Sequence, residues 1–343
     1  MKKVLICPLD WGLGHATRCI PVIKEIEKSC EVVVAGSGDS LELLKQEFPD
    51  MKFYEISSYG ITYSRKISFM LNMAWQTPRL LSAIAKEHKQ VNDIVEKENI
   101  GLVISDNRYG CYHKSVPSAI IIHQLSLIAP GVATYYNQKL IKRFNECWVP
   151  DTPDHRLSGK LSVNRNIKAK FIGPLSRMKP APAPVPGPRS LNVLALISGP
   201  EPHRSSFESL VARDLPNSGM TYKILRGLPK EHKETTGHFI NHLPAAELNH
   251  LVSSAEVIIS RSGYSTIMDL AALKKKAIFV PTPGQTEQVY LASELEKKKI
   301  ALMYAQEEFS LPAAMERLKQ FSGFTEEYFN DALLKNTLRE FLG

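Results

Sequence analysis

Short apolar runs that end in a glycine-containing turn recur along this chain, and they restrict its fold more than any other feature. The first run, KVLICPL at residues 3–9, leads into the turn DWGLGH and then into a helical stretch with Ile20, Ile23 and Ile26 at helical spacing. The β-branched run EVVVAGSG follows at residues 31–38. Strand, turn, helix and strand in this order predict a βαβ unit, which requires a parallel sheet.

Similar runs continue through both halves of the chain. They lack strict alternation of apolar and polar residues, which is typical of strands covered by helices on both faces. In the first half they lie at residues 102–106, 119–123 and 147–150, and in the second half at 191–199, 221–227, 238–243, 256–263 and 277–283. We therefore predict an α/β protein with two doubly wound domains.

The stretch KPAPAPVPGPRS, residues 179–190, separates the two halves. Its five prolines and one glycine exclude a helix or an inner strand and favour a stiff, extended linker. We predict an N-terminal domain over residues 1–178, a C-terminal domain over 191–324 and a final helix over 325–343, which can pack back on the first domain. Doubly wound sheets bind ligands at the carboxyl ends of their strands, so a cleft between the domains is the expected binding place.

Composition and charge narrow the class of protein. The chain has 343 residues, 43% of them hydrophobic and 23% charged, which suits two globular domains. Residues 1–178 hold 24 Lys and Arg against 17 Asp and Glu, a net +7, whereas residues 179–343 hold 19 against 18, a net +1. A basic first half suits an anionic acceptor, an anionic membrane surface or plain solvent. Since no nucleic-acid module or basic-aromatic repeat occurs, we predict no nucleic-acid partner.

Cysteine usage and hydropathy indicate the compartment. No Cys-x-x-Cys pair occurs, so the thiols are expected to be reduced and partly buried. They are Cys7, Cys19, Cys30, Cys111 and Cys147. The start of the chain lacks the apolar region of a signal peptide, and no apolar run reaches the roughly 18 residues of a membrane span. We expect a cytoplasmic protein, with peripheral contact to the inner face of the cell membrane as one arrangement.

The most informative stretch is ISRSGYSTIMDLAALKKKAIFVPTPGQTEQ, residues 259–288. A strand is expected to end at Ser260, and small residues around Gly263 lead into a helix that begins near Thr266. Free N–H groups at a helix start bind anions, and glycine allows a phosphate to approach closely. Asp269, one helical turn further on, can accept hydrogen bonds from a ribose diol. In the alternative interpretation, the hydroxyls only cap the helix and Asp269 is a solvated carboxylate.

This pattern resembles the donor-binding signature of GT-B glycosyltransferases, above all the peptidoglycan N-acetylglucosaminyltransferase and the UDP-glucuronosyltransferase-like enzymes. The likeness is strong over residues 259–292 and over the beginning of the chain. It implies two Rossmann-like domains, with the acceptor in the first and a nucleotide-sugar donor, by default UDP-linked, in the second. It also implies inversion at the anomeric carbon without a metal or another cofactor, and no Asp-x-Asp motif is present.

The resemblance assigns donor contacts in the second half. Asp269 stands where the family usually has a ribose-binding Glu, and Ile240 is expected to contact the base. Arg261 stands where the glucuronosyltransferase-like enzymes have His, whereas the peptidoglycan enzyme also has Arg there. The diphosphate is assigned to Ser262, Gly263 and Ser265 with Thr266 beside them, and the donor sugar to Glu287 and Gln288.

A second donor loop is expected at SGPEPHR, residues 198–204. Related enzymes usually have a glycine-serine loop here, and Ser198 and Gly199 keep part of that pattern. Two prolines remove backbone donors from the loop. Arg204 is therefore expected to supply positive charge to the departing diphosphate.

The turn WGLGH in the first half matches the acceptor-side loop of the family. Gly12 and Gly14 make the sharp turn, and His15 becomes the candidate general base that deprotonates the acceptor hydroxyl. Imidazole suits this task because its unperturbed pKa is about 6.5. Asp106, at the end of the run LVISD, is expected to orient His15, unless it only caps the next turn. Asp10 and His123 are the reserve candidates.

Residues 67–89 mix apolar bulk with basic residues. Such a segment can contact a membrane or a lipid-linked acceptor, or it can pack into the first domain's core.

We therefore predict a glycosyltransferase that moves a sugar from a nucleotide-sugar donor to an acceptor. The acceptor is unknown, and an anionic or a lipid-linked molecule is the candidate. A nucleotide-sugar 2-epimerase and a non-catalytic nucleotide-sugar-binding protein are the alternatives, because similar folds serve different functions.

Overall fold

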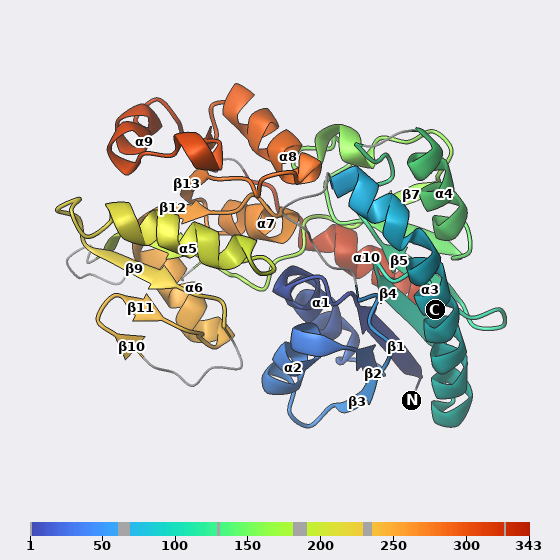
Figure 1. The fold of residues 1–343 in the computed structure, drawn as a ribbon. Helices are drawn as coiled ribbons and strands as arrows, with labels where there is room; N and C mark the ends of the chain where they lie inside the picture. The colour runs from blue at the N-terminus through green and yellow to red at the C-terminus, as the bar shows by residue number, and fades with distance from the viewer. Residues whose placement is uncertain (1, 61–68, 129–130, 181–190, 229–234, 326) are drawn as a thin grey trace. The chain divides into compact units, whose positions relative to one another are not determined.

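The chain divides into two compact units, which are shown as a ribbon in Figure 1. In this computed structural model the described residues are 2–60, 69–128, 131–180, 191–228, 235–325 and 327–343. Unit 1 comprises Met1–Leu175 and Tyr328–Gly343, and unit 2 comprises Ser176–Glu327. The chain thus leaves unit 1 three residues before the predicted boundary at residue 178 and returns to it for the last segment. Most of the predicted linker, residues 181–190, lies outside the described residues.

The described part of unit 1 contains a seven-stranded sheet in the order β3-β2-β1-β4-β5-β6-β7. Every neighbouring pair in it is parallel. The elements are β1 (Lys3–Pro8), α1 (Leu13–Ile26), β2 (Glu31–Gly36), α2 (Gly38–Glu47), β3 (Lys52–Glu55), α3 (Phe69–Glu98), β4 (Leu102–Asp106), β5 (Ser118–Ile121), α4 (Gly131–Ile141), β6 (Glu146–Val149), a 3-10 turn (Gly159–Ser162), β7 (Ala169–Phe171) and α10 (Asp331–Leu342).

Helices cover both faces of this sheet because its strands are apolar on both sides. Leu5 and Cys7 of β1 pack with Val91 and Val95 of α3, so α3 covers one face. The side chains between them on β1 point the other way, toward the face that α1 contacts. Helix α10 packs against α1, and its Phe341 ring meets Trp148 edge to face at 5.1 Å.

The described part of unit 2 repeats the theme with the strand order β10-β11-β9-β8-β12-β13-β14. The pairs are parallel except for β10 with β11. The elements are β8 (Leu191–Leu196), α5 (His203–Asp214), β9 (Tyr222–Leu225), β10 (Thr235–Thr236), β11 (Phe239–Ile240), α6 (Ala245–Ser254), β12 (Ala255–Ser260), α7 (Tyr264–Ala272), β13 (Lys276–Phe279), α8 (Thr286–Lys297), β14 (Leu302–Met303), a 3-10 turn (Gln306–Glu308) and α9 (Leu311–Leu318).

The core of unit 2 lies between the sheet and helices α5 and α9. Val193 and Ile259 of neighbouring strands pack with Phe207 of α5 and Leu311 of α9. Helix α6 contacts β8 and β12 as well. Two parallel, doubly wound α/β domains are therefore confirmed.

Three predictions from the sequence can be compared with the fold. Residues 69–89 of the segment predicted over 67–89 belong to α3, whereas residues 67–68 lie outside the described residues. Ile84 of that helix is buried, which supports core packing for the second half of the segment. All five cysteines are buried and form no disulfide. Within the described ranges, no helix has both the length and the apolar composition needed to cross a membrane.

Candidate functional site

The carboxyl ends of β1 and β4 bring the predicted residues of unit 1 together. The two strands are neighbours with Pro8 opposite Asp106, so whatever follows β1 lies beside the end of β4. The chain then turns sharply, with the N–H of Gly12 donating to the carbonyl of Asp10 at 3.0 Å. Gly12 has φ 85°, a left-handed conformation that favours glycine. Helix α1 begins directly afterwards at Leu13 and carries His15 in its first turn.

His15, Asp106 and Arg18 form a buried cluster. Nδ1 of His15 lies 2.9 Å from Oδ2 of Asp106, and Nε of Arg18 donates to the other carboxylate oxygen, Oδ1, at 2.6 Å. Side-chain exposure is 16% for His15, 2% for Arg18 and 0% for Asp106. The structure thus brings His15 and Asp106 into direct contact and leaves the imidazole as the partly exposed member.

The charges of this cluster favour a neutral imidazole. Burial lowers the pKa of His15, and the positive charge of Arg18 lowers it further, against the opposing effect of Asp106. The pKa of Asp106 lies below its ordinary value because Arg18 and His15 together outweigh the cost of burial. Arg18 already compensates the Asp106 carboxylate, so a proton on His15 would add a second, uncompensated positive charge.

The contact with Asp106 also decides which ring nitrogen is free. An ionised carboxylate only accepts hydrogen bonds, so Nδ1 of His15 donates to Asp106, although Nη2 of Arg18 lies 3.0 Å from the same nitrogen. The lone pair is then on Nε2. A neutral imidazole that is held through Nδ1 is the arrangement of a general base.

Arg18 is the residue of this cluster that the sequence analysis missed. Its signal was the spacing to His15, since residues three apart lie on the same face of a helix. His123, the reserve candidate, is 7% exposed and lies close enough to lower the pKa of His15. Asp10, the other reserve, accepts a hydrogen bond from Ser37 Oγ at 2.8 Å.

In unit 2 the predicted phosphate loop lies between β12 and α7. Gly263 is the N-cap with φ −66° and ψ 142°, so α7 begins at Tyr264, two residues before the predicted start. No side chain of the N-cap closes this helix end, and a Cβ placed on Gly263 would meet only Thr266 Oγ1, at 3.9 Å. Ser265 and Thr266 are half-buried in the first turn. The glycine N-cap thus leaves space beside the start of α7, where backbone N–H groups can bind an anion.

Two residues predicted to contact the donor have side chains that bind the protein itself, and their assignment to the donor stays a prediction. Ser262 is fully buried, and its hydroxyl donates to the carbonyl of Gln288 at 2.8 Å. Arg261 is 1% exposed and donates from Nη1 to the carbonyls of Val280 and Pro281 at 2.9 and 3.0 Å. Both side chains hold neighbouring loops together through these hydrogen bonds.

Asp269 stands partly exposed on α7, with a hydrogen bond that the sequence did not reveal. Ser176 Oγ donates to its Oδ1 at 2.5 Å, and Arg177 lies close enough to stabilise the ionised form. Burial nevertheless raises the pKa of Asp269 to about 6. The carboxyl group therefore changes charge close to neutral pH.

The loop after β13 places the remaining predicted sugar contacts at the start of α8. Glu287 lies in the first turn of that helix and is half-buried. Gln288 Oε1 accepts a hydrogen bond from the backbone N–H of Thr282 at 2.9 Å, so this amide also fixes the shape of its own loop.

The loop after β8 is exposed, and its arginine is already paired. Ser198 and Gly199 are exposed, and a Cβ placed on Gly199 would meet nothing within 4 Å. Arg204 contacts Glu201 Oε1 at 2.7 Å and Glu208 Oε2 at 2.8 Å. Arg204 is thus paired with two carboxylates in this structure, and its expected contribution of positive charge to the departing diphosphate stays a prediction.

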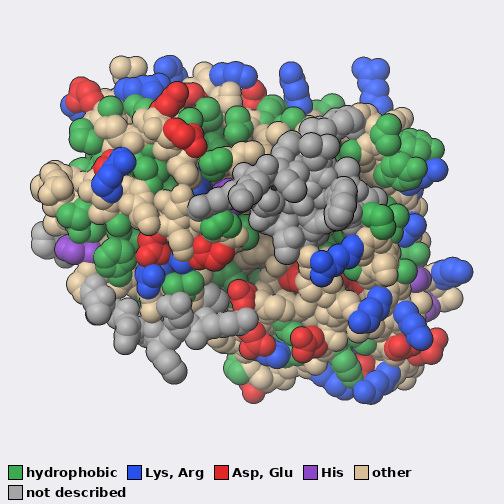
Figure 2. All heavy atoms as spheres, in the orientation of Figure 1, with side chains coloured by type: hydrophobic (Ala, Val, Ile, Leu, Met, Phe, Trp, Pro, Cys, Tyr) green, Lys and Arg blue, Asp and Glu red, His purple; other side chains and the backbone are tan. Residues whose placement is uncertain are grey.

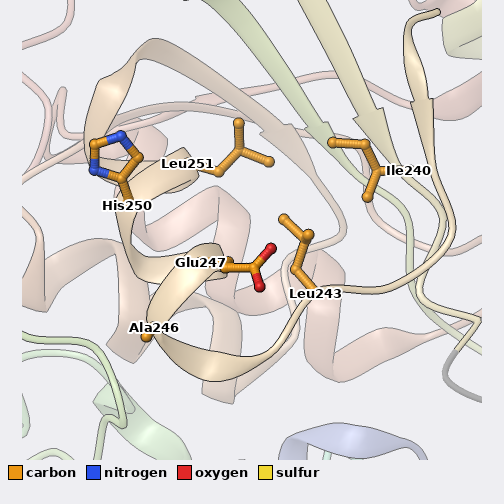
Figure 3. A pocket seen from close by; sticks show the side chains of 6 residues that line it. All are labelled: Ile240, Leu243, Ala246, Glu247, His250 and Leu251. Atoms are coloured by element: carbon orange, nitrogen blue, oxygen red, sulfur yellow. The ribbon is translucent and has the colours of Figure 1, made fainter. Parts of the chain in front are cut away.

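Ile240 lines a pocket of about 470 Å³ beside α6. In Figure 3 the side chains of Ile240, Leu243 and Leu251 form its apolar part, and Leu251 comes from α6 together with Glu247 and His250. The backbone carbonyl of Ile240 is used within the sheet, since it accepts from the N–H of Arg226 at 2.8 Å. The side chain of Ile240 lines the pocket and is therefore placed to contact a base.

Metal ligands and surface charge add little to these two sites. Among the described residues, no group of three His, Cys, Asp or Glu side chains is arranged to hold a metal ion. On the face drawn in Figure 2, Lys and Arg side chains are interspersed with Asp and Glu.

Comparison with known proteins agrees with this geometry. Residues 229–332 match the family model described as the glycosyltransferase family 28 C-terminal domain. Over 349 residues the chain is 31% identical to a UDP-N-acetylglucosamine–N-acetylmuramyl-(pentapeptide) pyrophosphoryl-undecaprenol N-acetylglucosamine transferase of Clostridium perfringens (strain SM101 / Type A), covering 96% of this chain and 93% of that protein. The protein of that name from Clostridium tetani (strain Massachusetts / E88) is 25% identical over 359 residues, covering 98% and 94%.

Solved structures show the same fold. The glycosyltransferase SnogD from Streptomyces nogalater superimposes with a TM-score of 0.68 over 100% of both chains, at 12% sequence identity. The predicted GT-B fold is thereby confirmed, as is the resemblance drawn from the motifs.

Proposed function

Because this chain belongs to the family of UDP-N-acetylglucosamine–N-acetylmuramyl-(pentapeptide) pyrophosphoryl-undecaprenol N-acetylglucosamine transferases, and is therefore a glycosyltransferase, we propose that it transfers a sugar from a UDP-sugar to a lipid-linked acceptor. The single observation that supports the chemistry best is the contact between His15 and Asp106, 2.9 Å apart at the carboxyl edge of the unit 1 sheet.

Unit 2 binds the donor in this proposal, without a metal or other cofactor. The start of α7, at Gly263 and Ser265, receives the diphosphate through backbone N–H groups. Asp269 accepts hydrogen bonds from the ribose, and Glu287 with Gln288 contacts the donor sugar. The base enters the pocket lined by Ile240, which has the apolar wall and polar rim that a nucleobase requires.

Unit 1 activates the acceptor. His15 Nε2 takes the proton of the acceptor hydroxyl as its oxygen attacks the anomeric carbon of the donor sugar. The bond between that carbon and the diphosphate oxygen breaks, and UDP leaves with the electron pair. The configuration at the anomeric carbon is inverted, because the attack comes from the face opposite the leaving group. Asp106 stabilises the imidazolium that forms, while the positive end of the α7 dipole stabilises the departing diphosphate.

An exposed apolar surface on α4 supports a lipid-linked acceptor and peripheral contact with the inner face of the membrane. Val132, Tyr135 and Tyr136 are 67%, 54% and 61% exposed. Basic side chains accompany them: Lys139 Nζ lies 4.7 Å from the Tyr135 ring centroid, and Lys142 is exposed just after the helix. Aromatic and basic residues together are typical of helices that lie on an anionic bilayer. Co-sedimentation with phosphatidylglycerol vesicles, and its loss in Val132→Asp, tests this contact.

The deciding experiment for the donor is calorimetric titration of the purified chain with UDP, dTDP, GDP and ADP, without added metal. We expect selective binding of UDP and weaker binding in Asp269→Ala. Absence of binding by all four nucleotides would contradict the donor site. The reported relatives are transferases and nothing favours an epimerase, which would convert the donor when no acceptor is present.

A further inference from the structure

The turns that deliver His15 and Asp106 share one buried side chain, Arg108. It lies in the turn after β4, two residues beyond Asp106, and is completely buried. The backbone N–H of Arg108 donates to Ser105 Oγ at 3.1 Å, and the same hydroxyl donates to the carbonyl of Arg108 at 2.6 Å. Since Ser105 belongs to β4, the backbone of Arg108 is fixed to the strand that ends in Asp106.

From this position the guanidinium of Arg108 is connected to the turn between β1 and α1. Nη2 donates to Ser37 Oγ at 2.6 Å, and Ser37 Oγ donates to Asp10 Oδ2 at 2.8 Å. The same Nη2 lies 3.5 Å from Asp10 Oδ1, so the two side chains also form an ion pair. Asp10 belongs to the turn that leads to His15, and its carbonyl accepts from the N–H of Gly12 at 3.0 Å. A buried chain of contacts therefore runs from the end of β4 to the turn before α1.

The first turn of α2 holds the same loop at two further points. Ser40 is buried, and its hydroxyl lies 3.0 Å from the carbonyl oxygens of both Leu9 and Gly12. Ser37 is the N-cap of this helix, so its contact with the loop comes from the same place. Glycine restricts the backbone less than any other residue, and Gly12 directly precedes α1. The place of the loop therefore depends on the side chains that surround it.

A second buried charge keeps the guanidinium in place. Nη1 of Arg108 donates to Glu87 Oε1 of α3 at 2.8 Å, and both side chains are 0% exposed. The other oxygen of Glu87 accepts from the Tyr59 hydroxyl and from the N–H of Gly110, each at 2.8 Å. One nitrogen of the planar guanidinium thus contacts Glu87 while the other contacts Ser37. Compared with apolar residues of similar size, a buried ion pair adds little or nothing to stability, so its presence here is better explained by the geometry that it imposes.

We propose that Arg108 is a positioning residue for the proton transfer by His15. Through Ser37 and Asp10 it holds the β1–α1 turn against the end of β4. Nδ1 of His15 then meets Asp106, and Nε2 is left to take the proton of the acceptor. Small displacements of a catalytic group lower a rate strongly, so this support matters although Arg108 itself touches no ligand. The inference rests on the proposed function for the role of His15, whereas the support can be measured without substrate.

The test determines the tautomer of His15 in the full chain. Nitrogen NMR of isotope-labelled histidine rings distinguishes a proton on Nδ1 from one on Nε2, and the signal of His15 is identified by its absence in His15→Ala. At about pH 8 the ring is neutral, and the hydrogen bond to Asp106 requires the proton on Nδ1. Free histidine favours the proton on Nε2, so loss of the contact with Asp106 moves the proton there.

Two variants interrupt the chain of contacts at different points. Ser37→Ala removes the hydroxyl between Arg108 and Asp10. Arg108→Lys keeps a positive charge beside Glu87, but a single ammonium group does not replace the two nitrogens of the guanidinium. In each variant the ratio of the Nδ1–H to the Nε2–H form of His15 should fall by about tenfold, the loss expected for a hydrogen bond to a charged group. Both changes together should add little to either alone, because they act on the same contacts.

Ser118→Ala is the matched control, and circular dichroism verifies that each variant is folded. Ser118 is another buried serine of this sheet, but it lies at the amino end of β5 and donates to the carbonyl of Val116 at 3.0 Å. Its removal should leave the tautomer ratio of His15 unchanged. A wild-type ratio in folded Ser37→Ala, or an equal fall in Ser118→Ala, would overturn the positioning role alone. A wild-type ring with its proton on Nε2 would contradict the proposed general base and, with it, this role.

Discussion

The two units place their functional groups at the same edge of similar sheets, but they build their sites from different materials. Unit 1 uses buried charges: His15, Asp106 and Arg18 contact one another directly, with Asp10 and Arg108 nearby. Unit 2 uses an open helix start with a glycine N-cap. Two of its arginines, Arg204 and Arg261, are paired with residues of the same unit. A cluster of titratable side chains can accept and release a proton. Backbone N–H groups do not titrate, so they can bind an anion whose charge changes during a reaction.

The largest effect is expected on kcat in His15→Ala, and it tests whether the proton is transferred by unit 1 alone. Loss of a positioned general base should lower kcat by about 10²- to 10⁴-fold. UDP affinity should be unchanged, because the donor groups lie in unit 2. The measurement is UDP release in the presence of acceptor, alongside calorimetry with UDP. His113→Ala, a half-buried histidine of the same unit, serves as the control.

The pH profile of the same reaction gives an independent check. Since the pKa of His15 is lowered, kcat/KM should rise with pH through a value below 6.5 and then level off. A profile that falls over this range would mean that His15 acts in its protonated form.

Arg18→Met should have the next largest effect, on stability. The substitution leaves the Asp106 carboxylate buried without its cation, which costs about 3–5 kcal/mol for a broken buried pair. Urea unfolding measures it. Arg213→Met removes an exposed arginine paired with Asp214 in unit 2 and should cause a much smaller change. Equal losses of unfolding free energy in Arg18→Met and Arg213→Met would contradict the distinction between buried charges in unit 1 and exposed ones in unit 2.

Arg18→Met should also move the acid limb of the kcat/KM profile to higher pH, because Arg18 lowers the pKa of His15.

A moderate effect is expected from pH on ligand binding in unit 2. The pKa of Asp269 is about 6, so its carboxylate is ionised above that pH and protonated below it. Hydrogen bonds to an ionised acceptor are the stronger ones, so affinity should fall as the pH drops, by about tenfold between pH 7 and 5. Uridine is the probe, because it carries no phosphate that titrates in this range. Asp269→Asn should abolish the dependence, and a variant that retains it would show that another group is responsible.

The smallest effect is expected from Ser176→Ala. The hydroxyl donates to Asp269 Oδ1 and thereby lowers the pKa of that carboxyl group. Its removal should move the midpoint of uridine binding to higher pH, with less than about a tenfold change in affinity at pH 7. Ser176→Thr keeps the hydroxyl and should keep the wild-type midpoint. A shift in the opposite direction would mean that Ser176 competes with the ribose for Asp269.

The fold was largely predictable because it depends on local patterns that the sequence displays. The apolar runs at residues 3–9 and 256–263 correspond to β1 and β12. Short edge strands such as β3 (Lys52–Glu55) were not predicted, since a strand with one open edge carries a weaker apolar signal. The start of α7 was placed two residues late, because helix boundaries depend on the backbone of the N-cap.

The positions of the candidate site residues were more predictable from the sequence than the contacts of their side chains. His15 and Asp106 were paired correctly, since parallel strands deliver both to one edge of the sheet. Arg261 and Ser262 were assigned to a ligand although they bind protein carbonyls. Motif spacing predicts where a residue lies on its helix, strand or loop. The hydrogen-bond partners of its side chain depend on residues far away in the sequence. Ser176, 93 residues before Asp269, is such a partner.

Helix α10 gives the chain an architecture with a practical consequence. Unit 1 is assembled from two separate pieces of sequence, whereas unit 2 is one uninterrupted segment, Ser176–Glu327. Unit 2 is thus an insert with two junctions, and if it binds the donor as proposed, exchange of this segment between relatives should change the donor preference with it. Truncation behaves in the opposite way: removal of the last helix takes Phe341 from Trp148 and damages the half that begins at the other end of the chain.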